Sequence, residues 1–236
     1  MHATSQAQFD ATRAGGLPPV ELVRENLWAV PVPIPGGYMS YSLLYILRDD
    51  VFGFHLIDPG WDDDENWQRV LDALTQVGAR IEDVRTVTAT HIHPDHSRMA
   101  DRVRAASGAV VGIRESEVKS IDVQGISAET QERNFAMWGV PEARRDELRR
   151  MLVGMPGRSL PTADRTLTDG ERLDIPGIDL FVLATPGHTP AVDPDATVWT
   201  IAQQLTWTSG WDRLAGFYRY SALAQTAMHR DYCLSA

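Results

Sequence analysis

The chain has 236 residues, 43% of them hydrophobic, which is enough for one sizeable core but a tight fit for two complete domains. The formal net charge of −10 disfavours nucleic acid and anionic membranes as partners unless basic residues are locally focused. A single cysteine, Cys233, excludes an intrachain disulfide and a cysteine-rich metal cluster, and no apolar run reaches bilayer length. We therefore expect a cytoplasmic protein without a membrane span.

The first part of the chain predicts a β-meander followed by a helix. Residues 1–20 contain no apolar segment behind a basic one and are expected to be a flexible N-terminal segment. Between residues 21 and 58, short apolar runs are separated by turn residues, which is typical of successive strands. From Asp62 the apolar residues recur at helical spacing up to Val77, acidic residues crowd the first turn and Gly78 follows the last. Strands are predicted over 27–32, 41–47 and 54–58.

Beyond residue 80, strands and helices alternate, which indicates an α/β fold with layers covering a sheet. A helix with Met99 and Val103 on its buried face is expected to end at Gly108. The Glu- and Arg-rich segment 127–151 predicts two helices with solvated outer faces, interrupted by Gly139-Val-Pro141. Further strands are predicted over 84–90, 109–113, 165–175 and 178–185.

The segment Thr90-His-Ile-His-Pro-Asp-His96 packs three imidazoles and a carboxylate into one short loop after a strand. Alternate side chains of an extended segment face the same way, so His91 and His93 can bind one metal ion. Asp95 and His96, at the start of the following helix, can face a second point, and zinc accepts both nitrogen and oxygen ligands. An isolated histidine is usually a satisfied core or surface residue, which is our interpretation of His2, His55 and His229; a cluster of this density predicts a metal site.

A second histidine-containing turn lies downstream, where a predicted strand ends in Pro186-Gly-His188-Thr-Pro190. There His188 could complete the His91/His93 site and leave a fourth position open for water. Taken alone, this segment would be an ordinary turn.

Together these motifs resemble the metallo-β-lactamase superfamily, and most closely its glyoxalase II-like and general hydrolase branch. The matching segments are Leu56-Ile-Asp-Pro-Gly60, the histidine loop from His91 to His96, and Thr185-Pro-Gly-His188, and the resemblance covers roughly residues 22–190. It implies an αββα sandwich with the metals at one edge of its two sheets. It also implies that Asp58 hydrogen-bonds beneath the metal loop.

The resemblance further implies which residues bind each metal. His91, His93 and His188 would bind one ion, and Asp95 and His96 would bind the other. Up to two Zn²⁺ ions are expected, with Fe or Mn as possible substitutes. A metal-bound water becomes hydroxide at neutral pH, so we expect a zinc-dependent hydrolase in which Asp95 is the catalytic residue.

The substrate depends on loops, here 31–41 and the helical insert 127–151. The acidic surface and the absence of an aromatic-and-basic platform favour a small ester or thioester over nucleic acid. The basic cluster Arg144, Arg145, Arg149 and Arg150 contains interleaved acids, which is typical of a solvated helix face. A phosphodiesterase or ribonuclease of the same fold is an alternative.

The C-terminal part departs from the resemblance after Pro190. The family pattern continues with a strand ending in Gly-Asp and later a final histidine, and neither Asp212 nor His229 maps clearly onto these positions. We therefore expect a metallo-β-lactamase-like domain over 21–190 and a divergent segment over 191–236 that leaves the fold incomplete. Residues 197–208 show strand-like alternation, and a truncated or frame-shifted reading of the gene would explain the change. A catalytically impaired protein without the second metal is the corresponding alternative.

Overall fold

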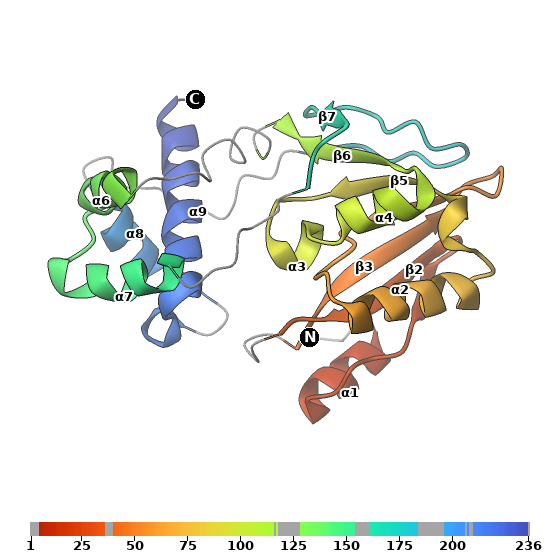
Figure 1. Cartoon of the computed structure of the whole chain (residues 1–236), viewed down its shortest axis with the longest axis horizontal. Helices are drawn as coiled ribbons and strands as arrows, with labels where there is room; N and C mark the ends of the chain where they lie inside the picture. Colours follow the sequence, from red (N-terminus) through yellow and green to blue (C-terminus); the bar gives the residue numbers. More distant parts are fainter. Residues whose placement is uncertain are drawn as a thin grey trace. The chain divides into compact units, whose positions relative to one another are not determined.

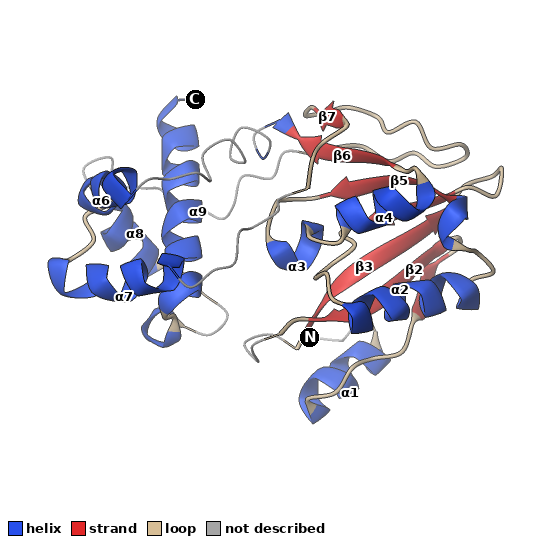
Figure 2. Cartoon of the chain, viewed as in Figure 1, coloured by secondary structure: helices blue, strands red, loops and turns tan. Residues whose placement is uncertain are grey.

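The computed structural model describes residues 5–35, 40–115, 117, 128–153, 161–183, 196–205, 207 and 210–235. The chain forms two compact units. Met1–Val123 and Ser159–Leu183 make up an α/β unit, and Gln124–Arg158 and Ala184–Ala236 make up a helical unit (Figures 1 and 2). The α/β fold class predicted from the sequence is confirmed. None of the described helices is long and apolar enough to cross a membrane.

The α/β unit is built on a mixed sheet of seven strands that lie side by side in sequence order. The first four strands are antiparallel, which confirms the predicted meander, and β4 to β7 pair in parallel. The strands are β1 (Glu21–Arg24), β2 (Leu27–Pro33), β3 (Tyr41–Arg48), β4 (Phe54–Ile57), β5 (Val84–Ala89), β6 (Val110–Arg114) and β7 (Arg165–Leu167).

Helices α2 and α4 cover one face of this sheet (Figure 1). Helix α2 begins where the Asp63 side chain accepts a hydrogen bond from the Asn66 N–H, and α4 ends at Gly108 in the left-handed conformation. Both helices were predicted from their apolar spacing and end signals. The helices of this unit are α1 (Gln6–Ala14), α2 (Asp64–Gln76), η1 (Ile81–Asp83), α3 (Pro94–Ser97) and α4 (Ala100–Ser107).

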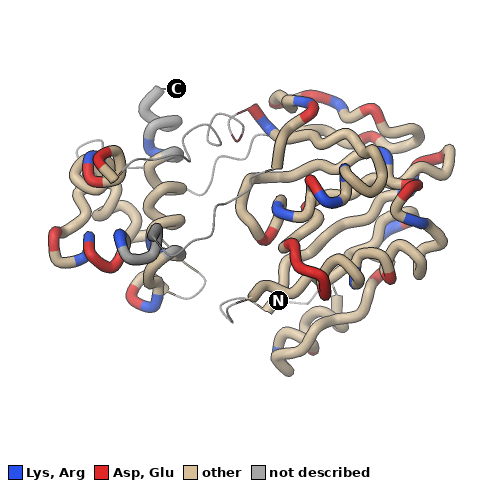
Figure 3. Tube along the Cα trace, viewed as in Figure 1, with Lys and Arg blue, Asp and Glu red and all other residues tan. Residues whose placement is uncertain are grey.

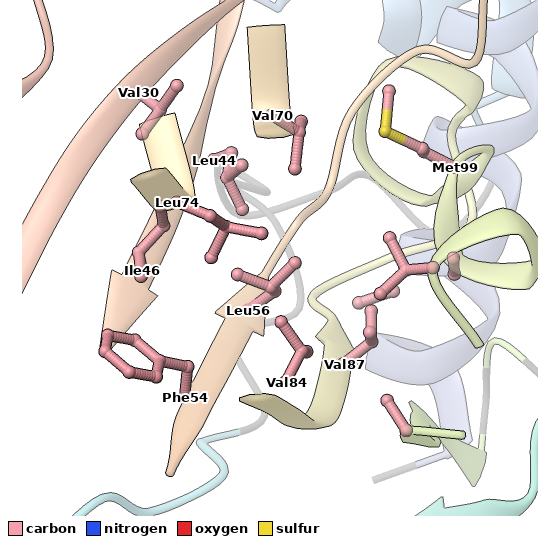
Figure 4. Packing of buried hydrophobic residues seen from close by; sticks show 14 of the residues in the cluster. Val30, Leu44, Ile46, Phe54, Leu56, Val70, Leu74, Val84, Val87 and Met99 are labelled. Carbon is pink, nitrogen blue, oxygen red and sulfur yellow. The ribbon is translucent and has the colours of Figure 1, made fainter. Parts of the chain in front are cut away.

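The main core lies between the sheet and these two helices. Alternate residues of β3 face it, so Leu44 and Ile46 are fully buried whereas Leu43 is only partly buried. Side chains from α2, including Val70 and Leu74, pack against them (Figure 4). Each such side chain contributes about 1.5–3 kcal/mol through burial. This core fixes the strand ends that carry the candidate site.

Two predicted features of the α/β unit differ from the structure. The strand predicted over 165–175 ends at Leu167, because a turn follows it. In this turn Gly170 has a φ of 74° and the Glu171 carboxylate accepts a hydrogen bond from the Thr168 N–H. The strand predicted over 178–185 is wrong for its described residues 178–183, which form only isolated bridges in a hairpin. Residues 6–14, within the segment expected to be flexible, form helix α1, whose N-terminus is capped by Ser5.

The helical unit contains α6 (Ala128–Met137), α7 (Glu142–Val153), α8 (Val198–Gln204), η2 (Trp211–Arg213) and α9 (Gly216–Ser235). The two helices predicted over 127–151 are confirmed. The strand-like interpretation of 197–208 is wrong for residues 198–204, which form α8. Helices from both parts of the sequence share one core, whose members include Phe135, Leu148, Val198 and Leu223. Only one sheet is present among the described residues, whereas the expected sandwich has two.

Candidate metal centre

The predicted metal loop follows β5 at the sheet edge where the parallel strands β4, β5 and β6 have their carboxyl ends. The structure brings His91, His93, Asp95 and His96 together there. The imidazole centroid of His91 lies 4.5 Å from that of His93 and 4.2 Å from that of His96. Nε2 of His96 lies 3.4 Å from Oδ2 of Asp95. Pro94 at the first position of α3 begins the turn that returns Asp95 and His96 to the loop.

Asp58, directly after β4, organises this cluster by hydrogen bonding. Its Oδ1 accepts the Thr90 N–H at 2.7 Å, and its Oδ2 accepts the Thr90 hydroxyl at 2.7 Å and Nδ1 of His96 at 2.8 Å. Because Thr90 donates its hydroxyl proton to Asp58, its oxygen accepts from Nδ1 of His91 at 3.0 Å. In their neutral forms, both histidines then carry the proton on Nδ1, which leaves Nε2 as the nitrogen with a lone pair.

The backbone at Asp58 is itself unusual. Its φ of 54° lies in the left-handed region, which aspartate tolerates better than most residues. Gly60 follows at φ 93°, and a Cβ there would lie 2.6 Å from Cγ1 of Val32. Its N–H donates to the His96 carbonyl at 3.1 Å and its carbonyl accepts from Met99. This turn therefore both presents the Asp58 carboxylate and joins the metal loop to β4.

Two further side chains hold the loop backbone. The Ser42 hydroxyl, on β3, donates to the Asp95 carbonyl at 2.6 Å. The Glu117 carboxylate, beyond β6, accepts the Ile92 N–H at 3.1 Å. Sequence reasoning missed Thr90, Ser42 and Glu117, because their roles depend on strands that lie side by side only in the folded chain.

The environment favours different protonation states for the two histidines. Burial, together with the neighbouring imidazoles of His93 and His96, lowers the pKa of His91 to about 3, against the opposing charge of Asp58. Burial also disfavours charged His96, yet the hydrogen bond and charge of Asp58, with the charge of Asp95, raise its pKa above the usual value. His91 is consequently neutral at physiological pH, as a metal ligand requires.

The donor set fits zinc chemically, while the described residues supply only part of a complete site. Two tetrahedral ligands with bond lengths of about 2.0–2.2 Å lie about 3.4 Å apart, which matches the separation between His96 and Asp95. Within the part of the chain that the structure describes, no three His, Cys, Asp or Glu side chains form a complete metal-binding group. His188, with the rest of Thr185-Pro-Gly-His-Thr-Pro190, lies outside the described residues.

His55 lies away from this cluster, as the interpretation of it as a satisfied core histidine predicted. It is 3% exposed, with Nε2 3.2 Å from Oδ2 of Asp49 and Nδ1 2.8 Å from the Thr86 hydroxyl. Asp49 also accepts the Val51 and Gly53 N–H groups, so this network closes the turn between β3 and β4. His55 is therefore a structural residue.

Comparison with known proteins agrees with this arrangement. Residues 35–193 match the model of the metallo-beta-lactamase superfamily, which is more than half of the chain. The matched range includes Asp58, the whole metal loop and His188. The chain therefore belongs to the metallo-beta-lactamase superfamily.

Individual relatives cover shorter parts. A hydroxyacylglutathione hydrolase from Albidiferax ferrireducens is 35% identical over 80 residues, which are 34% of this chain and 27% of the relative. A metallo-beta-lactamase family protein from Thermus thermophilus is 27% identical with a TM-score of 0.50, over 70% of this chain and 54% of that one. A beta-lactamase domain protein from Burkholderia ambifaria shares the fold, with 21% identity and a TM-score of 0.51, over 67% of this chain and 46% of that one. The chain thus spans about half or less of the length of these relatives.

Proposed function

We propose that this chain is a zinc-dependent hydrolase acting on a small ester or thioester. The observation that carries the proposal is the loop in which His91, His93, Asp95 and His96 converge on one sheet edge above the Asp58 carboxylate. His91 and His93, with His188, would hold one zinc ion, and Asp95 and His96 would hold a second. Fe or Mn would suit the same nitrogen and oxygen donors.

Asp58 and Asp95 would have different roles in the proposed hydrolysis. A bound zinc ion lowers the pKa of a water ligand and polarises the bond under attack. Asp58 fixes the tautomers of His91 and His96 through Thr90 and through its direct hydrogen bond, so Nε2 of each neutral ring would be the nitrogen available to a metal. Asp95 would orient the attacking water and transfer its proton to the leaving group.

The choice of substrate class rests on the relative and on surface charge. The bond that joins an acyl group to glutathione is a thioester, and a hydroxyacylglutathione hydrolase is among the similar proteins. Figure 3 shows acidic and basic residues interspersed along α7. Three of its arginines are paired with acids: Arg144 with Glu147, Arg145 with Glu142, and Arg149 with Glu132 and Asp146. Such pairing supports a small-molecule substrate more than a phosphate backbone.

The zinc-loaded full chain would be tested on thioester, ester, lactone, β-lactam and phosphodiester substrates. We expect turnover of thioester or ester, and Asp95→Asn is expected to lose about 10²–10⁴-fold in kcat while retaining part of the metal. Hydrolysis of phosphodiesters alone would replace this proposal with the nuclease alternative. No turnover by zinc-replete protein would favour the catalytically impaired alternative. Helices α8 and α9 support that alternative, because the family pattern continues beyond Pro190 with a strand.

A further inference from the structure

The metal loop has carboxylates on both of its sides. Strand β5 lies between β4 and β6 in the parallel part of the sheet, and each neighbour is followed by an acidic residue. Asp58 after β4 accepts the Thr90 N–H at 2.7 Å, and Glu117 after β6 accepts the Ile92 N–H at 3.1 Å. The loop that emerges from the central strand is thus held at alternate backbone N–H groups, from opposite sides.

Glu117 holds the loop backbone between two of the predicted metal ligands. Ile92 is the residue between His91 and His93, and its side chain is 9% exposed. A rotation of the peptide unit at Ile92 would turn the flanking imidazoles in different directions. The apolar Ile92 side chain packs in the main core, so its burial and the Glu117 hydrogen bond together restrict that rotation.

We propose that Glu117 is a positioning residue that fixes the relative directions of His91 and His93 through the Ile92 N–H. Asp58 positions imidazoles through hydrogen bonds to the side chains of Thr90 and His96, whereas Glu117 accepts its hydrogen bond from the backbone of the loop. This inference rests on the proposed metal site for its effect on zinc, but the hydrogen bond itself belongs to the folded chain without metal.

Two substitutions separate positioning from folding. Glu117→Gln keeps an oxygen that can accept the Ile92 N–H, whereas Glu117→Ala removes the acceptor. Glu82→Ala is the matched control, because Glu82 is exposed in η1, before β5. Zinc affinity would be measured by competition with a chromophoric chelator, and the absorption spectrum of bound Co²⁺ would report ligand geometry. Hydrogen exchange at the Ile92 amide would be followed in metal-free protein.

We expect Glu117→Ala to lose about 10–100-fold in zinc affinity, to alter the Co²⁺ spectrum and to expose the Ile92 amide to exchange. Glu117→Gln should keep the zinc affinity, the Co²⁺ spectrum and the Ile92 exchange rate close to those of the wild type, and so should Glu82→Ala. Wild-type affinity and spectrum in Glu117→Ala, or an unchanged Ile92 exchange rate, would overturn the inference, even if its urea midpoint falls. A wild type that binds neither zinc nor Co²⁺ would overturn the proposed function and the role of Glu117 in orienting metal ligands. Exchange at the Ile92 amide would still show whether Glu117 holds the loop backbone.

Discussion

Oδ2 of Asp58 accepts a hydrogen bond from Nδ1 of His96 at 2.8 Å, and the far nitrogen of the same ring lies 3.4 Å from Oδ2 of Asp95. One imidazole therefore connects a carboxylate beneath the loop with a carboxylate in the predicted site. A histidine fixed in this way has one tautomer and one direction in which its lone pair points. The contact joins the end of β4 to the start of α3 across the sheet edge.

The first prediction concerns this contact. Asp58→Asn should lower zinc affinity by about 10–100-fold, because an amide offers one acceptor oxygen where the carboxylate serves Thr90 and His96 with two. Chelator competition on the purified full chain measures the change. Asp62→Asn, at a half-buried ion pair with Arg102, is the control. Equal affinity in Asp58→Asn and wild type would show that Asp58 does not orient a metal ligand.

The second prediction tests the two faces of β3. Leu44 is fully buried against α2, whereas its neighbour Leu43 is only partly buried on the other face. Leu44→Ala should lower the free energy of unfolding by about 2–5 kcal/mol, and Leu43→Ala should cost less. Urea denaturation measures the free energy of unfolding of both variants, and they can be compared if their m-values are equal. A larger loss in Leu43→Ala would mean that the strand register is wrong.

The third prediction concerns acid. Burial lowers the pKa of His55 below 6.5, although its hydrogen bond to Asp49 opposes this. Burial raises the pKa of Asp49, but hydrogen bonds from Gly53, His55 and Val51 outweigh it and lower the value below 3.8. The pKa of each group is lower in the folded chain than in the unfolded chain. Each group therefore stabilises the fold fully at a pH above its unfolded-state pKa, and this stabilisation is lost as the pH falls through its folded-state pKa. The stabilisation from His91, which has a pKa of about 3, is likewise lost as the pH falls. The stabilisation from His96, whose pKa is raised, is instead lost as the pH rises.

Metal-free protein should therefore unfold more easily as the pH falls from about 7 to about 5, and His55→Gln should make this dependence shallower. Glutamine can still donate to Asp49 and accept from Thr86, but it does not titrate. Urea midpoints measured with a chelator at several pH values provide the comparison. Parallel curves for the two proteins would exclude His55 as a source of the acid sensitivity.

The fourth prediction concerns the C-terminal residues. Leu223 of α9 is fully buried with Phe135 of α6 and Leu148 of α7, although almost 90 residues separate the first two along the chain. Leu223→Ala should lower stability by about 2–5 kcal/mol and change the fluorescence of the unit, where Trp138 belongs to the same core. Ser221→Ala, on the same helix and only partly buried, serves for comparison. No effect of Leu223→Ala would contradict a shared core.

Sequence reasoning succeeded where local pattern and tertiary environment agree. The alternation around Leu44 and the helical spacing of Val70 and Leu74 each reflect one buried face, and the structure has both elements where they were predicted. The four predicted donors of the metal loop also lie together, because they are neighbours in sequence, and metal binding by them stays a prediction.

Sequence reasoning failed where the spacing of apolar residues fitted both a helix and a strand, or where the contacting residue is distant in the sequence. Val198, Ile201 and Ala202 are buried at helical spacing behind the Thr197 cap, but the surrounding threonines and tryptophans also resemble a strand. Glu117 lies 25 residues from Ile92, and nothing in its local sequence indicates that contact. Pairing between parallel strands creates such relationships, and a single sequence does not show them.

Zinc content is the most direct test of the proposed metal centre. The wild type, the His91→Ala/His93→Ala double variant and a His2→Ala control would be loaded with zinc, dialysed and analysed for metal beside their circular dichroism spectra. We expect the wild type and His2→Ala to retain zinc, and the double variant to fold but lose most of it. Equal zinc in the double variant and the wild type would contradict a metal centre at the end of β5.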